Sequence, residues 1–154
     1  MLSQFNDYDY EDSYSIECPE DLLMSEVLNS FFTMTPWPIR ILMRIRNFFV
    51  SFFKLKTGRS DRTFKSKEIK SGDQIGLFEI EEIGRDFVLM GADDTHLNFR
   101  VAFEVQDGLL KCNTRVKFNN LSGKVYFYLI RPFHRFIVPA LLRSSIRHLA
   151  RPFK

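Results

Sequence analysis

The sequence contains few of the residue patterns that mark common enzymes and metal sites. Its two cysteines, Cys18 and Cys112, lie far apart, and neither belongs to a CxxC pair or a cysteine–histidine spacing. A serine nucleophile elbow, a P-loop and a dinucleotide-binding fingerprint are also missing. We therefore expect no metal and no cofactor, and the sequence identifies no catalytic residue.

A targeting segment and a membrane-spanning run are lacking as well. The chain begins MLSQFNDYDYEDS, without the basic and apolar stretches of a signal peptide, which predicts a cytoplasmic protein. Residues 39–55 are strongly apolar, but this run is too short for a span and carries Arg44 and Arg46. In a reducing cytoplasm the two cysteines are expected to be free thiols.

Phenylalanine is abundant, with 17 copies among 154 residues. Hydrophobic residues make up 45% and charged residues 27%, which fits one globular domain over residues 1–154. We expect residues 1–6 to be disordered and residues 56–74 to form a flexible basic loop. The phenylalanines fit either an aromatic core or the lining of an apolar pocket, and both interpretations stay open.

Charge is distributed unevenly although the net charge is only +3. Residues 1–26 carry eight acids and no base, whereas residues 131–154 carry six bases and no acid. We expect the acidic N-terminal segment to lie near the basic helices.

The N-terminal third predicts one strand and two short helices. Alternation of tyrosines and polar residues predicts a strand from Tyr8 to Ile16, interrupted by Asp12. A helix is expected to enter at Cys18–Asp21 and to end near Thr33, and a second to span residues 39–55. The first helix should bury five apolar side chains: Leu22, Leu23, Val27, Leu28 and Phe31.

From Ile75 onward the pattern has a period of two residues, which predicts an antiparallel sheet. In the segment from Thr95 to Gln106, alternate residues are apolar and the residues between them are polar. Asp107-Gly108 is a strong signal for a hairpin turn. The four expected strands are Ile75–Ile83, Phe87–Gly91, Leu97–Val105 and Leu109–Phe118.

A long helix is expected to close the chain over residues 124–149, with Ser122 near its N-cap. Pro132 and Pro139 fall inside it, so we expect the helix to be kinked or divided there. The fold class is therefore α+β, with a curved antiparallel sheet, two short N-terminal helices and a long kinked C-terminal helix. This order of elements is that of a helix-grip domain.

Three segments carry a resemblance to a known family: TPWPIRILMRIRN (Thr35–Asn47), GADDTHLNFRV (Gly91–Val101) and NNLSGKVYFYLIRPFHRFIV (Asn119–Val138). They resemble a bacterial family of small proteins of unknown function that is assigned to the Bet v 1/START-like (SRPBCC, helix-grip) superfamily. The resemblance implies a cavity between the sheet and the C-terminal helix, which in relatives holds lipids, sterols or other apolar molecules. Where the family usually has an acid, this chain has Asn98.

Two groups of residues are candidates for a functional site. His134 could face the expected cavity and orient a polar head group, or its ring could bond a carbonyl freed by a proline. Asp94, His96, Asn98 and Arg100 alternate along one strand and could act together, but their parity places them on the polar face. The expected cavity lining is Phe99, Phe103, Val116, Tyr126, Phe133, His134 and Ile137.

Three functions remain open. The leading one is a non-catalytic binding module for a small hydrophobic molecule or lipid. The second is an enzyme that acts on an apolar substrate, with His134 as the acid–base group. The third is a peripheral membrane or protein-interaction module that uses the helix at 39–55. A homodimer is possible through the polar face, and no nucleic-acid partner is expected.

Overall fold

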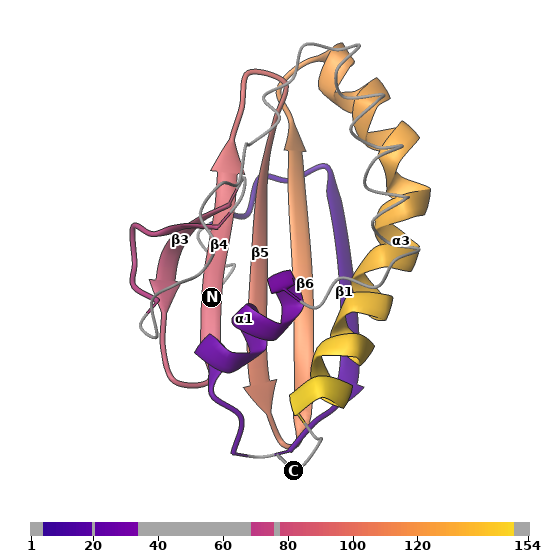
Figure 1. Cartoon of the computed structure of the whole chain (residues 1–154). Helices are drawn as coiled ribbons and strands as arrows, with labels where there is room; N and C mark the ends of the chain where they lie inside the picture. Colours follow the sequence, from indigo (N-terminus) through magenta and orange to yellow (C-terminus); the bar gives the residue numbers. More distant parts are fainter. Residues whose placement is uncertain (1–4, 20, 34–68, 76–77, 150–154) are drawn as a thin grey trace.

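The computed structural model describes residues 5–19, 21–33, 69–75 and 78–149. In this part of the chain, two helices lie on one face of a six-stranded antiparallel sheet (Figure 1). The predicted α+β class is confirmed at this level. The second expected N-terminal helix, at residues 39–55, lies outside the described residues.

The sheet has the strand order β1-β6-β5-β4-β3-β2. Every neighbouring pair is antiparallel. In chain order the elements are β1 (Tyr10–Glu17), α1 (Met24–Thr33), β2 (Gln74–Ile75), β3 (Phe78–Ile83), β4 (Phe87–Asp93), β5 (Leu97–Gln106), β6 (Leu109–Phe118) and α3 (Leu121–Leu149).

The hairpin of β5 and β6 confirms the predicted alternation. Their register pairs Phe103 with Cys112 on the helix-facing side, and both side chains are buried. Asp107 and Gly108 form the turn with φ angles of 52° and 70°. Positive φ at both central residues gives the twist that a two-residue hairpin requires, and glycine adopts it without strain.

The expected single strand Ile75–Ile83 is wrong, because the structure has two strands there. Ile75 of β2 pairs antiparallel with Phe78 of β3, so the chain reverses between them. Gly76, inside the apolar run, was the available signal, since glycine in a strand pattern often marks a break.

Helix α1 begins later than expected, at Met24 rather than near Cys18–Asp21. Leu23 was expected to be buried but is 42% exposed. Leu23 precedes the helix, so its side chain does not follow the helical repeat that places Met24, Val27 and Phe31 on the buried face. The ring of Phe31 packs edge-on against Phe103 of β5, with centroids 5.0 Å apart.

Asn120, not Ser122, caps the start of α3. Its Oδ1 accepts a hydrogen bond of 2.9 Å from the backbone N–H of Gly123. Gly123 also lies so close to the carbonyl of His96 that no side chain fits between them. The helix therefore begins against the loop that joins β4 and β5.

Helix α3 runs through both prolines as one continuous helix, as the long C-terminal helix was expected to do; of the expected kink or division, the division is wrong. The helix is instead bowed along the sheet (Figure 1). Pro132 and Pro139 are seven residues apart, nearly two full turns, and so lie on about the same side. Each removes a helical hydrogen bond there, which favours a gentle bend in one direction.

The N-terminal segment lies on the outer face of the sheet. Tyr8 stacks on the guanidinium of Arg115 of β6, 4.4 Å from the ring centroid, and Lys117 pairs with Asp7 at 2.6 Å. The acids of this segment were expected beside basic helices. Most of the ion pairs that the structure shows for these acids are instead with basic side chains of β6. The reason is that alternate polar side chains of β1, such as Glu11, point to the outer face of the sheet.

Candidate functional site

A group of polar side chains lies on the inner face of the sheet, opposite α3. We call it the inner polar cluster. Tyr10, Asp12 and Tyr14 alternate along β1 and so point to the same, helix-facing side. Strand β6 contributes one residue and α3 contributes two. The members of the cluster are Tyr10, Asp12, Tyr14, Thr114, Arg131 and His134.

The Asp12 carboxylate is the centre of this cluster. Its Oδ2 accepts hydrogen bonds from the hydroxyl of Tyr10 at 2.9 Å and from that of Tyr14 at 3.4 Å. Nε2 of His134 lies 3.2 Å from the same oxygen, within ion-pair distance when the imidazole is protonated. The side chain of Asp12 is 12% exposed and that of His134 is 26% exposed. The helix thus places a histidine against a largely buried acid.

Several polar atoms of the cluster have no hydrogen-bond partner among the described residues. They are Oδ1 of Asp12, Oγ1 of Thr114, Nε of Arg131 and Nε2 of His134, whose approach to Asp12 is not aligned with the ring N–H. Thr114 is 4% exposed and stands directly opposite Asp12 in the register of β1 and β6. Leaving such groups unpaired costs about 1–3 kcal/mol each, so folded proteins rarely bury them together without a purpose.

Local charge sets the protonation of the acid. Burial by itself raises the pKa of Asp12, but the contact and charge of His134, with the hydroxyl of Tyr10, outweigh it and hold that pKa below its ordinary value. Burial, and then the negative charge of Asp12, raise the pKa of Tyr14. Asp12 is therefore an anion at neutral pH and the tyrosine is a neutral donor.

Two apolar groups flank the inner polar cluster along α3. Toward the start of the helix, Leu97, Val116, Tyr126 and Phe127 are buried together, and Tyr10 packs on Phe127 with ring centroids 4.6 Å apart. Toward the end of the helix, the main core joins α1, the central strands and α3, and Tyr14 packs against it. The polar atoms therefore lie between two apolar regions.

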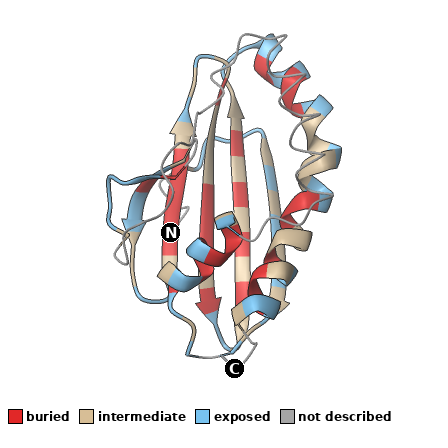
Figure 2. Ribbon diagram, viewed as in Figure 1, coloured by how far each residue is buried: buried red, intermediate tan, exposed pale blue. Residues whose placement is uncertain are grey.

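The residues expected to line one cavity are divided between these regions. Val116 and Tyr126 belong to the first, whereas Phe103 belongs to the main core. Phe99 contacts both. Ile137 is buried on α3, and Phe133 and His134 are partly buried. Figure 2 shows the buried positions concentrated on the central strands and on α1 and α3.

A pocket of about 330 Å³ lies away from the inner polar cluster. It lies between the start of α1 and the turn that joins β3 and β4. Its lining includes Leu23, Met24, Ile69 and Ile83, together with Lys70 and Arg85. It contains none of the residues expected to line the cavity.

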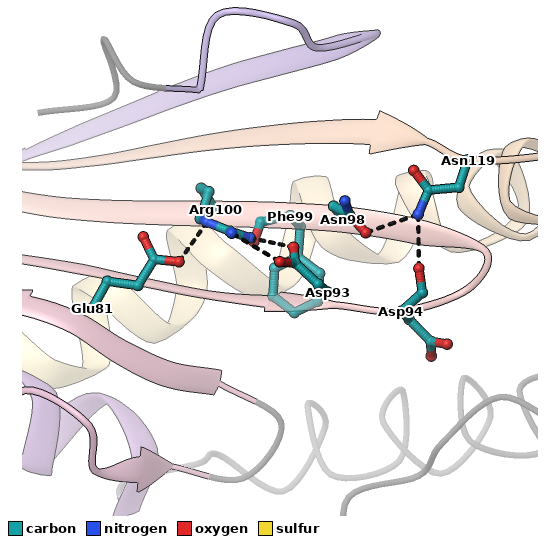
Figure 3. A network of polar contacts seen from close by, with 7 residues as sticks. All are labelled: Glu81, Asp93, Asp94, Asn98, Phe99, Arg100 and Asn119. Atoms are coloured by element: carbon teal, nitrogen blue, oxygen red, sulfur yellow. Dashed lines mark hydrogen bonds and ion pairs between the residues drawn. The ribbon is translucent and has the colours of Figure 1, made fainter.

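The four polar residues expected to act together do not form one group. Figure 3 shows Arg100 held between Glu81 of β3 and Asp93 of β4, at 2.6 Å and 2.7 Å. Its guanidinium crosses above Gly91, where a Cβ would overlap it. The hydrogen bond from Arg100 holds the pKa of Asp93 below its usual range. Arg100 lies on the outer face, as its parity predicts, and its charge is already paired there.

Asp94, His96 and Asn98 belong to a second set of contacts at the end of the sheet. Asp94 and His96 precede β5 and so are not on the strand as expected. The side-chain nitrogen of Asn119 donates to the carbonyl of Asp94 at 2.7 Å and lies 2.8 Å from the amide of Asn98 (Figure 3). His96 contacts the amide of Asn120. These contacts join two loops and cap α3.

The sequence pointed to His134 as a candidate, but not to Asp12, Thr114 and Arg131, which the structure places in the same cluster. Asp12 breaks the alternation of β1, and that break is the signal. A charged residue at a helix-facing position of a strand is expensive unless it has a partner, so it indicates a polar group opposite. Among the described residues, no group of three or more His, Cys, Asp or Glu side chains could hold a metal ion.

No helix in the described part of the chain is long and apolar enough to cross a membrane. No curated protein sequence matches the chain. A family profile described as "Protein of unknown function (DUF2867)" matches residues 4–141, nearly the whole length. The chain therefore belongs to the DUF2867 family.

Proposed function

We propose that the chain is a non-catalytic binding module of the helix-grip superfamily, which holds a small molecule between the sheet and α3. The molecule has an apolar body and a polar group. The observation that supports this is the inner polar cluster, where unpaired polar atoms lie between two apolar regions. Ligand sites combine such surfaces, because apolar contact supplies affinity and a few polar groups fix orientation.

The unpaired atoms suggest the chemistry of the polar group. Nε of Arg131 can donate and Oδ1 of Asp12 can accept, while the hydroxyl of Thr114 can do both. A carboxylic acid, a hydroxyl or an amide on the ligand satisfies this set better than a fully apolar molecule does. The free thiols Cys18 and Cys112 agree with a protein of a reducing cytoplasm.

Native mass spectrometry of the freshly purified chain tests the proposal, because a bound molecule adds its mass to the protein. A fluorescent 18-carbon fatty acid then serves as a probe. We expect Thr114→Val and His134→Gln to weaken its binding about tenfold each, as loss of one buried hydrogen bond predicts. His96→Ala is the matched control, because His96 contacts the loop at Asn120 and not the inner polar cluster.

Unchanged binding in both inner variants would contradict the proposal. So would an experimental structure with less than roughly 300 Å³ of free space between the sheet and α3, since ligand pockets begin near that volume.

The contact of Asp12 with His134 favours a second candidate, an enzyme that acts on an apolar substrate. An acid that orients a histidine is a common arrangement for general acid–base catalysis. Slow turnover of a co-purified molecule, abolished in His134→Gln, would favour this candidate over simple binding.

A further inference from the structure

Helix α3 exposes a row of large apolar side chains on the side away from the sheet. Leu121 is 75% exposed and Phe136 is 73% exposed, and three more residues of the same helix are also exposed. At 100° per residue, all five fall within an arc of about 100°. We call them the α3 apolar stripe: Leu121, Val125, Tyr128, Leu129 and Phe136.

This stripe is unusual for the part of the molecule that the structure describes. Two other large hydrophobic residues are exposed there, Tyr8 and Leu23, and each stands apart on another element. Scattered exposed apolar residues are ordinary, whereas a continuous row usually marks a contact surface. With a rise of 1.5 Å per residue, the stripe from Leu121 to Phe136 is about 22 Å long.

The charges around the stripe are of one sign. Helix α3 has no acidic residue over its 29 positions. Lys124 and Arg135 lie just to one side of the stripe, and Arg143 and Arg147 continue its direction toward the C-terminus. All four basic side chains are exposed. The surface therefore combines apolar and aromatic side chains with positive charge.

We propose that this face of α3 docks on an anionic membrane surface, with the stripe in the interfacial layer and the four cations near lipid phosphates. Helices that lie on membranes have this composition, since apolar side chains enter the headgroup boundary and cations are attracted to anionic lipids. A second copy of the chain fits the α3 apolar stripe and its flanking cations less well than an anionic membrane does. Two identical α3 faces would bring like charges together.

Vesicle co-sedimentation of the full chain tests the proposal. Vesicles of phosphatidylcholine with about a third phosphatidylglycerol are compared with vesicles of phosphatidylcholine alone, at low and high salt. We expect binding to the anionic vesicles, and weaker binding in high salt because ions screen the attraction. The double variant Leu121→Ser/Phe136→Ser should lose at least about tenfold in affinity, since two apolar anchors are removed.

Charge is tested separately from apolar contact. Lys124→Gln and Arg143→Gln should each reduce the affinity for anionic vesicles roughly fivefold. Arg85→Gln is the matched control for charge and Leu23→Ser for apolar contact, because both residues are exposed but lie away from α3. Circular dichroism and thermal melts establish that each variant remains folded.

Three results would overturn the proposal. The first is absence of the chain from the anionic vesicle pellet at low salt. The second is equal binding to neutral vesicles. The third is full binding by the folded stripe variant, which would assign the contact to another segment, such as the basic residues at 39–55.

Discussion

Replacement of Asp12 by asparagine tests whether the inner polar cluster depends on a buried negative charge. The change keeps the shape of the side chain but removes its charge. The Tyr10 hydroxyl at 2.9 Å and the His134 ring at 3.2 Å then face a neutral acceptor, while the Tyr14 hydroxyl at 3.4 Å contributes little in either case. Hydrogen bonds to a charged group contribute about 1.5–3 kcal/mol, against about 0.5–1.5 kcal/mol for neutral pairs.

The hydrogen bond from Tyr10 and the ion-pair contact with His134 are both weakened, and the cost of burying a charge is relieved in part. We therefore expect the free energy of unfolding to fall by about 2 kcal/mol at pH 7. For a chain of this size, that corresponds to a lower melting temperature by about 4–8 °C.

The effect should depend on pH in a defined direction. The pKa of Asp12 is lower in the folded protein than its ordinary value, which is near 3.9 in an unfolded chain. The stabilisation that its charge provides is therefore complete above about pH 4 and is lost as the pH falls through the folded value. The difference between the wild type and Asp12→Asn should shrink when both are measured at pH 3.

Urea unfolding followed by circular dichroism measures both quantities. Glu11→Gln is the control, because Glu11 is the adjacent acid on β1 but faces outward and pairs with Arg115 in a more exposed place. Exposed pairs contribute less than about 1 kcal/mol. The reasoning would be refuted if Asp12→Asn were as stable as the wild type at pH 7, or if the two variants behaved alike.

Three further predictions concern packing, turn geometry and thiol chemistry. Gly123→Ala should lower stability by about 1–3 kcal/mol in a thermal melt, because its Cβ would overlap the carbonyl of His96; an unchanged melting temperature would show that the helix start can move freely. Gly108→Ala should cost about 1 kcal/mol in urea unfolding, since φ is 70° there, and a neutral effect would contradict the turn. With Ellman's reagent, Cys112 should react much more slowly than Cys18, because full burial raises the pKa of its thiol; equal rates in the native protein would count against a buried Cys112.

The parity of the central strands could be predicted from the sequence. Side chains alternate between the faces of a strand, so the alternation from Leu97 to Gln106 separates the helix-facing side from the polar side without any knowledge of neighbours. The same rule placed Arg100 on the outer face. Asp107-Gly108 determined the hairpin, because its local backbone preference matches the turn.

The ends of the helices and strands were harder to predict from the sequence. The start of α1 and the position of the Asn120 cap depend on hydrogen bonds to residues distant in the sequence, Arg85 and Thr95. The reversal between β2 and β3 is made by local pairing instead. At α1, the backbone N–H of Met24 donates to the carbonyl of Arg85, which fixes the entry to the helix. The conformational propensities of neighbouring residues do not include the effect of a hydrogen-bond partner that is distant in the sequence.

The grouping of the polar residues was decided by the tertiary structure alone. In the sequence, Asp94, His96, Asn98 and Arg100 look like one cluster. Arg100 instead reaches Asp93 on the adjacent strand β4 and Glu81 on β3, the strand beyond it. Spacing along a strand gives the face but not the neighbours across it. Similarly, Asp12 and His134 are more than a hundred residues apart in the chain, and it is the packing of α3 over β1 that brings them within 3.2 Å.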